Sequence, residues 1–491
     1  RTSSGKTDRS RLLATAALRD AVPASPDGAD GTDGAGIERL YSVATGAVAV
    51  GPDSDFFSLG GDSLTAMRLV HLLRSGGADV RLRDVLAAPT PRLLSELLDA
   101  RASTVRTPTD DGATTSTAVD SKPWATARGA VAAHLRDPDS RAHNVPFALL
   151  VDGQVDLAAL RRRVNALIRH QPMLRTRFTL ERRTDRATEW LRQETLPANG
   201  ATAVDVSRRT VTEPSAWTTE SIHDHLRRAA VPFDLARGPL VRVEVVSACG
   251  SDLVVVDVHH SVFDGTSLDV FLAAVSADAD RGVRRTVTAR PSDPDTTDLE
   301  HWRARFASLP APVDLDLAWE RSDSSLGTTS TTLAPETSDA VRTRCAALGI
   351  TEYALFASAA AVVLQRYTLA EDLVVGMPVD LRRGPSDAES IGMWVSTLPV
   401  RIRVSDDHTV RHLLTTAGAE VLDALDHASA PLDVIQTAIQ AEHPGERVDL
   451  LHAIVAVRRA GLTSVDLGGG SARLFGPVSI EAKTDLEFTV E

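Results

Sequence analysis

Apolar residues recur along the chain in two patterns, and each pattern predicts a different kind of element. In the long C-terminal part, short apolar runs typical of buried strands alternate with longer stretches of helical periodicity. The strand-like runs are LVVVDV at 253–258, DLVVGMPV at 372–379 and HAIVAV at 452–457, and the helical stretches are LAALRRRVNALIRH at 157–170 and YALFASAAAVVLQRY at 353–367. This part therefore predicts an α+β or α/β region.

A shorter block, residues 37–102, carries only helical spacing and predicts a small helical bundle. The segments 23–36 and 103–121, rich in Gly, Ala, Pro, Ser, Thr and Asp, flank it and predict linkers, because they have little apolar surface to bury. A further break near 289–300 divides the α+β region into two lobes. The predicted organisation is a short segment 1–22, the block, and lobes at 122–290 and 291–491.

Composition limits the functions that these units can have. The chain has 491 residues, which suggests about three folding units. Its net charge of −13 is the wrong sign for binding nucleic acid or an anionic membrane. Cys249 and Cys345 are the only cysteines, so neither a disulfide framework nor a cysteine zinc site is expected. With no signal peptide and no apolar run of 18 residues, a cytoplasmic location is expected.

The short block contains the sequence DFFSLGGDSLTAMRLVHLL at 55–73. Gly60 and Gly61 permit a tight turn, and Ser63 then stands at the start of an amphipathic helix. A serine there is ordinarily a helix cap. The same place also suits a phosphodiester, because backbone N–H groups and the helix dipole point toward it.

In the α+β region, the buried run at 253–258 leads directly into HHSVFDG at 259–265. Because side chains alternate across a strand, His259 and His260 point to opposite faces, and only one can serve a given site. Three interpretations are open from the residues alone. His260 and Asp264 could bind a metal, although no third ligand stands at useful spacing; the two histidines could be structural; or His260 could take part in acyl transfer.

Both segments resemble known families. The region 55–73, followed by VRLRDVLAAPTPRLLSELLDA at 80–100, resembles peptidyl carrier domains of nonribosomal peptide synthetases. The HHSVFDG segment resembles the His-His-x-x-x-Asp-Gly motif of condensation domains, and the resemblance extends over about 123–491. It includes RHQPMLRTRF at 169–178, PFDLARGPLVRV at 232–243, VVGMPVDLRR at 374–383 and IGMWVSTLPVRI at 391–402. The start, RTSSGKTDRSRLL at 1–13, resembles the end of adenylation domains, with Lys6 at the position of their lysine.

The resemblance implies a multidomain protein: a four-helix carrier bundle followed by an α+β condensation domain of two chloramphenicol-acetyltransferase-like lobes. It implies that Ser63 carries phosphopantetheine, that His260 is catalytic, that His259 is a packing neighbour, and that Asp264 and Gly265 hold the loop. It further suggests that Arg175 is the ion-pair partner of Asp264. No metal is expected.

The implied reaction is amide formation between an acyl thioester and an aminoacyl thioester on a downstream carrier. The implied partners are that carrier, the upstream adenylation domain of the same synthetase and a phosphopantetheinyl transferase. The chain departs from the family pattern at Thr266 and Ser396, where an aromatic residue and an asparagine are usual, and in 125–135, where Arg128 is kept but aromatics are absent. The family's final strand and helix are expected after 483–491, so the chain is predicted to be truncated.

Two alternatives to condensation share the motif. Epimerisation domains have the same histidine loop and also follow carriers, but the extra glutamate motif that they use has no candidate here. A catalytically inactive recruitment platform of the same fold loses the histidine pair, which this sequence keeps. Both predict the same fold and differ in what the histidine site does.

Overall fold

The computed structural model divides the chain into two compact units. The smaller unit takes residues 1–115, 336–352 and 421–426, and the larger unit takes residues 116–335, 353–420 and 427–491. Lys6, Ser63 and the predicted linker at 103–121 lie outside the described residues. The described residues are 34–47, 49–56, 58, 59, 61, 65, 66, 69, 70, 72, 73, 78, 80–102, 123–182, 189–198, 203–212, 216–276, 291, 294–311, 326–382, 385–446, 448, 450, 451, 453–458, 462–468 and 470–491.

Before residue 103, the smaller unit contains helices α2 (Gly34–Thr45), α4 (Leu82–Ala87) and α5 (Pro91–Ala102). Tyr41 and Phe56 are fully buried, and their rings meet edge to face with centroids 5.6 Å apart. Ile37 lies one turn before Tyr41 and is equally buried, so packing extends the helix toward its N-terminus. Residues 34–36, which composition assigns to a linker, therefore form the first turn of α2 instead.

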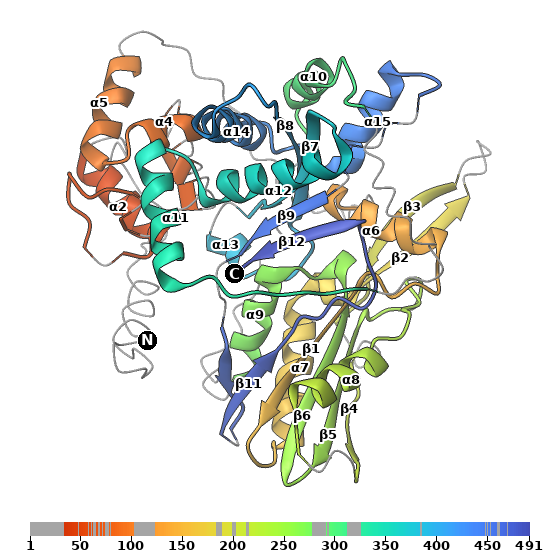
Figure 1. The fold of residues 1–491 in the computed structure, drawn as a ribbon. Coiled ribbons are helices and arrows are strands. Elements are labelled where there is room, and N and C mark those ends of the chain that lie inside the picture. Colours follow the sequence, from red (N-terminus) through yellow and green to blue (C-terminus); the bar gives the residue numbers. More distant parts are fainter. Residues whose placement is uncertain are drawn as a thin grey trace. The chain divides into compact units, whose positions relative to one another are not determined.

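The larger unit is built on two main sheets (Figure 1). The first sheet has the order β10-β11-β1-β6-β5-β4. Its central strand β6 pairs antiparallel with both β1 and β5, and β4 forms one edge, parallel to β5. The strands are β1 (Asn144–Val151), β4 (Val206–Thr210), β5 (Val241–Ala248), β6 (Ser251–His259), β10 (Ser464–Asp466) and β11 (Ser471–Phe475).

Both faces of the first sheet are covered by helices, which explains its nearly continuous apolar runs. On one face, Phe147 and Leu149 join a large core cluster with helices α6 (Ala125–Arg136), α7 (Leu157–His170) and α9 (Gly265–Val275). On the other face, Ala148 and Leu150 pack with Ile222 and Leu226 of α8 (Thr219–Ala229). The alternation along β1 therefore separates two cores.

The second sheet has the order β12-β9-β7-β8 and is formed by strands from the C-terminal part of the chain. Its strands are β7 (Asp372–Asp380), β8 (Val395–Arg403), β9 (Ala453–Val457) and β12 (Leu486–Val490). A separate hairpin joins β2 (Thr176–Arg182) to β3 (Glu189–Thr195). The remaining helices of the described later chain are α10 (Thr296–Arg305), α11 (Pro335–Leu348), α12 (Glu352–Thr368), α13 (Pro385–Ala388), α14 (Val410–Asp426) and α15 (Leu432–Glu442).

Strands β10 and β11 come from the end of the chain but belong to the first sheet. Strand β11 pairs antiparallel with β1, with Ala148 opposite Phe475 and Val151 opposite Ala472. Residues 464–475, which the sequence assigns to the second lobe, are thus part of the sheet of the first. The lobe boundary in sequence is not the boundary between the two sheets.

Within the described part of the chain, no single helix is long and apolar enough to cross a membrane; α11 and α12 pass that test only when taken together across a bend.

Candidate active site

His260 stands directly after the buried strand β6 and begins a short 3-10 turn, His260–Val262, that leads into α9. Its backbone N–H donates to the His143 carbonyl at 2.7 Å. Its Nδ1 lies 2.7 Å from the Phe263 carbonyl oxygen, so Nδ1 carries the proton. This assignment leaves Nε2 as a proton acceptor on a half-buried ring.

Burial, and then the positive charge of Lys483, lower the pKa of His260 to about 3. The imidazole is therefore neutral at pH 7. A neutral imidazole with a free Nε2 can accept a proton from a substrate amine, whereas an imidazolium cannot.

His259 is fully buried, on the face of β6 that continues from Val255. Its Nδ1 accepts a hydrogen bond from the Ser261 backbone N–H at 3.2 Å and lies 2.8 Å from the Ser261 hydroxyl. Its ring packs edge to face on His134 and Phe233, at 5.1 and 5.9 Å between centroids. Desolvation lowers its pKa well below the usual value. The structure places His259 in the core and His260 at the end of the strand.

Asp264 caps α9 and is held by an arginine from the second sheet. One carboxylate oxygen accepts from the Ser267 N–H and hydroxyl, at 2.9 and 2.8 Å. The Arg382 guanidinium binds both oxygens, at 2.9 and 3.0 Å, and the Trp394 N–H donates to Oδ2 at 2.9 Å. Because this pair is buried and bidentate, it fixes the loop after His260 to the strands β7 and β8.

Arg382 also binds Asp380, with Nη1 at 3.2 and 3.0 Å from its two oxygens. Burial on its own lowers the pKa of Arg382, but the charges of Asp264 and Asp380 outweigh it and raise the pKa. The guanidinium is therefore a permanent cation whose charge is already balanced by two carboxylates.

The predicted partner of Asp264, Arg175, is wrong. Arg175 ends a 3-10 turn, Pro172–Arg175, where its Nε donates to the Ile168 carbonyl at 3.1 Å and its Nη1 donates to the Leu196 carbonyl. It thereby binds a carbonyl of the last turn of α7, where cations are favourable. Several arginines precede strands in this sequence, and spacing alone does not identify the one that reaches Asp264.

Gly265 is the first residue of α9, and the geometry does not require glycine there. Its φ is not positive, and no atom of the described chain lies within 4 Å of the Cβ position. Thr266 donates its hydroxyl proton to Asp380 at 2.7 Å, so the residue that replaces the usual aromatic adds a second link to β7. Ser396 on β8 is buried, and its hydroxyl has no hydrogen-bond partner among the described residues.

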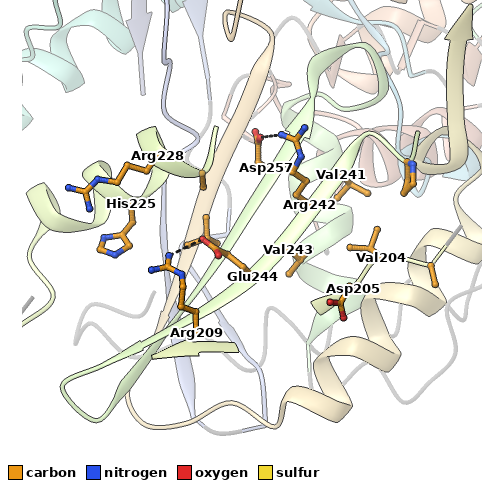
Figure 2. A pocket seen from close by; sticks show the side chains of 14 residues that line it. Val204, Asp205, Arg209, His225, Arg228, Val241, Arg242, Val243, Glu244 and Asp257 are labelled. Carbon is orange, nitrogen blue, oxygen red and sulfur yellow. Dashed lines mark hydrogen bonds and ion pairs between the residues drawn. The ribbon is translucent and has the colours of Figure 1, made fainter. Parts of the chain in front are cut away.

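A cavity of about 610 Å³ lies at the β4 edge of the first sheet (Figure 2). Its lining includes Asp257, which accepts from Asn144 at 2.8 Å and Arg242 at 3.3 Å. Burial raises the pKa of Asp257 to about 7, against the opposing effect of these two partners. Neither His260 nor Asp264 lines this cavity, so it is separate from the histidine site.

The described residues before Ser63 form a tight turn. The Gly61 N–H donates to the Phe56 carbonyl at 2.8 Å, and the Leu59 N–H donates to the Asp55 carbonyl at 3.0 Å. A Cβ on Gly61 would lie 2.3 Å from the Phe56 ring, so only glycine fits. Residues 65 and 66, shortly after, are helical. A tight turn before Ser63 and helical residues after it are what the sequence predicts around a phosphopantetheine serine, and Ser63 itself lies outside the described residues.

Comparison with known proteins identifies the families of two domains. The condensation domain family matches residues 123–277 and 288–466, and the phosphopantetheine attachment site family matches residues 37–98. The chain therefore belongs to the condensation domain family, with a carrier domain before the condensation domain. It is homologous to nonribosomal peptide synthetases, which use this order of domains.

Among its relatives, malpinin synthetase of Mortierella alpina is 25% identical over 93% of this chain, and surfactin synthase subunit 1 of Bacillus subtilis (strain 168) is 26% identical over 94%. The chain spans only 6% and 13% of these two relatives. The first condensation domain of the CDA synthetase has a similar structure, with a TM-score of 0.57 at 22% identity, covering 76% of this chain and 90% of that domain. The condensation domain of the monacolin K polyketide synthase MokA also has a TM-score of 0.57, at 18% identity, over the same shares.

Proposed function

We propose that this chain carries an acyl group as a thioester on Ser63 and that its condensation domain joins that group to the amine of an aminoacyl thioester on a downstream carrier. The observation that carries the proposal is the protonation state of His260, whose Nδ1 is bound by the Phe263 carbonyl while Nε2 is free to accept a proton. The site needs no stronger base. An α-amine has a pKa of about 8, so an appreciable fraction is already uncharged at pH 7.

Phosphopantetheine, bound to the carrier serine, would supply the thiol that forms the thioester. Within the condensation domain, the chain's own residues do the rest. The pair of Asp264 and Arg382 holds the His260 turn against β7 and β8. His260 accepts the amine proton at Nε2 as the carbon–nitrogen bond forms, and returns it to the departing sulfur.

Further partners follow from this proposal. They are an adenylation domain upstream in the same synthetase, an aminoacyl carrier downstream and a phosphopantetheinyl transferase that modifies Ser63. A cytoplasmic location accords with the thiol-based substrates and with two cysteines that do not form a disulfide.

Mass spectrometry of the intact proteins tests the proposal. A phosphopantetheinyl transferase loads acyl-pantetheine onto the wild type, an aminoacyl carrier is added, and transfer of the acyl mass to the acceptor is followed in time. Ser63→Ala should take up no arm. His260→Ala should load normally but transfer about ten- to a thousandfold more slowly.

The same experiment separates condensation from epimerisation. Without an acceptor, an epimerisation domain exchanges the α-hydrogen of a bound aminoacyl group for deuterium from D₂O, and condensation does not. Deuterium uptake without amide formation contradicts the proposal, and so does a His260→Ala variant as fast as the wild type.

A further inference from the structure

The segment before β12 runs alongside the first residues of β1 and the residues that precede it. The Val478 N–H donates to the Pro146 carbonyl at 3.0 Å. Three residues later, the Glu481 carboxylate accepts from the Ser140 hydroxyl at 2.8 Å and from the Arg141 N–H and Nε at 2.8 and 3.0 Å. The side chain of Glu481 is only 11% exposed, so this end of the segment is firmly held.

Lys483 follows two residues after this anchor and three residues before Leu486, which begins β12 and pairs with Ala453 of β9. His143 lies on the stretch that Glu481 and Val478 bind, and its carbonyl accepts from the His260 N–H at 2.7 Å. The backbone on both sides of Lys483 is therefore fixed, close to the stretch that contacts the His260 turn.

The charge of Lys483 acts on the histidines. It contributes to lowering the pKa of His260, His259 and His143, in each case after the larger effect of burial. Burial also lowers the pKa of Lys483 itself to about 8. The residue as a whole is exposed to solvent.

Lys483 has no close carboxylate, unlike the arginine of the site. Among the described residues, none places a carboxylate oxygen within the 4.0 Å of an ion pair from its ammonium. Arg382, by contrast, is paired with Asp264 and Asp380. Since His260 is neutral, the charge of Lys483 is not balanced by an ion pair with any described residue and is available to a ligand.

We propose that Lys483 is a further catalytic residue of the condensation reaction, whose ammonium stabilises the oxyanion of the tetrahedral intermediate. The inference rests on the proposed function. The amine nitrogen bonds to the thioester carbon, and the carbonyl π pair moves to oxygen, where it faces the ammonium. When that pair returns, the carbon–sulfur bond breaks, and the amine proton passes through His260 to the thiolate. Lys483 keeps its proton throughout.

The contribution depends on pH through Lys483 alone. The titratable and charged groups that act on it or feel its charge come from four elements: His259 and His260 at the end of β6, His143 before β1, Glu487 on β12 and Arg458 after β9. As pH rises through about 8, the ammonium loses its proton, and the stabilisation of the oxyanion is lost with it.

Single-turnover amide formation by the loaded protein, from pH 6.5 to 9.5, tests the inference. Lys483→Met should be about ten- to a hundredfold slower than the wild type at pH 7. The ratio of the two rates should fall toward one above pH 8. Lys483→Arg should keep most of the rate, and its ratio to Lys483→Met should stay constant past pH 9. Deprotonation of the acceptor amine affects all variants alike and cancels in these ratios.

A second measurement does not depend on activity. The chain has only three lysines, Lys6, Lys122 and Lys483. After reductive ¹³C-methylation, the NMR signal missing from Lys483→Arg identifies Lys483, and its titration midpoint should lie well below those of the other two. Arg458→Met removes a nearby exposed positive charge as a matched control, and its rate at pH 7 should stay within about twofold of the wild type.

A Lys483→Met variant as fast as the wild type overturns the inference, and so does a slow variant whose ratio to the wild type does not change with pH. If Lys483→Met does not fold, as judged by its melting temperature, Lys483→Arg decides, because a fall in rate near pH 8 like that of the wild type contradicts the role of the ammonium. An inactive wild type, or a fully active His260→Ala, instead refutes the proposed function.

Discussion

The buried pair of Asp264 and Arg382 offers a test of how the turn that carries His260 is held. Asp264 accepts hydrogen bonds from the Ser267 N–H and hydroxyl, the Trp394 N–H and two nitrogens of Arg382. The side chains of the pair are 0% and 4% exposed, so solvent and salt do not screen them. Removing either partner leaves buried polar groups without compensation.

The two single substitutions should lower the free energy of unfolding by different amounts. Asp264→Ala removes the cap of α9 but leaves Arg382 paired with Asp380, and should cost about 3 kcal/mol of unfolding free energy. Arg382→Ala strands two carboxylates and should cost about 4 to 5 kcal/mol. The double variant removes the partners together and should cost about 2 kcal/mol less than the sum.

Urea unfolding followed by tryptophan fluorescence measures these costs in the larger unit alone, because all six tryptophans belong to it. Asp224→Ala is the matched control. It breaks an exposed pair with Arg227, whose side chains are 41% and 51% exposed, and should cost less than about 0.5 kcal/mol. Strict additivity in the cycle, or an Arg382→Ala variant no less stable than the control, would refute the reasoning.

Three further predictions concern the packing histidine, the buried carboxyl and the serine turn. His259→Ala should lower the stability of the larger unit by about 2 to 4 kcal/mol in the same urea assay, because the ring is fully buried; a loss of transfer rate with unchanged stability contradicts a packing role. The raised pKa of Asp257 means that its contribution to stability is full below pH 4 and is lost as pH rises to about 7. Asp257→Asn should therefore remove a decline of about 2 to 3 kcal/mol between pH 5 and 8, and an unchanged slope contradicts this assignment. Gly61→Ala should slow phosphopantetheine transfer to Ser63 because its Cβ overlaps Phe56, whereas Gly51→Ala, with 3.9 Å to its nearest atom, should not.

The helices and strands with a clear apolar period could be predicted from the sequence, because each of these patterns fits only one kind of element. The stretch 157–170 coincides with α7, 353–367 lies within α12, and 372–379 lies within β7. The run at 253–258 lies within β6, but the strand ends at His259 and His260 begins a 3-10 turn, so strand alternation does not determine the direction of His260. The local apolar pattern is therefore enough to predict a helix or strand that depends only on its own residues.

Contacts between distant segments could not be read in the same way. Arg382 is 118 residues from Asp264 in the chain. Several other arginines could form the same ion pair, and the sequence contains no distance information that would favour Arg382 over Arg175. The surroundings of Lys483 could not be predicted either, because the neighbouring Glu481 is held by Arg141, which is 340 residues away in the chain. The start of α2 was missed because Gly and Ala composition outweighed the buried Ile37 and Tyr41.

The return of β11 to β1 has a consequence for how this domain is made and divided. Ala148 meets its partner Phe475 only after more than 300 further residues have been synthesised. Until then, one edge of the first sheet presents unpaired backbone groups, which favours slow folding and pairing with other chains. A fragment cut near residue 290 keeps β1 and its neighbour β6 but loses its other neighbour, β11. Engineers who exchange lobes between synthetases should therefore move residues 464–475 together with the first lobe.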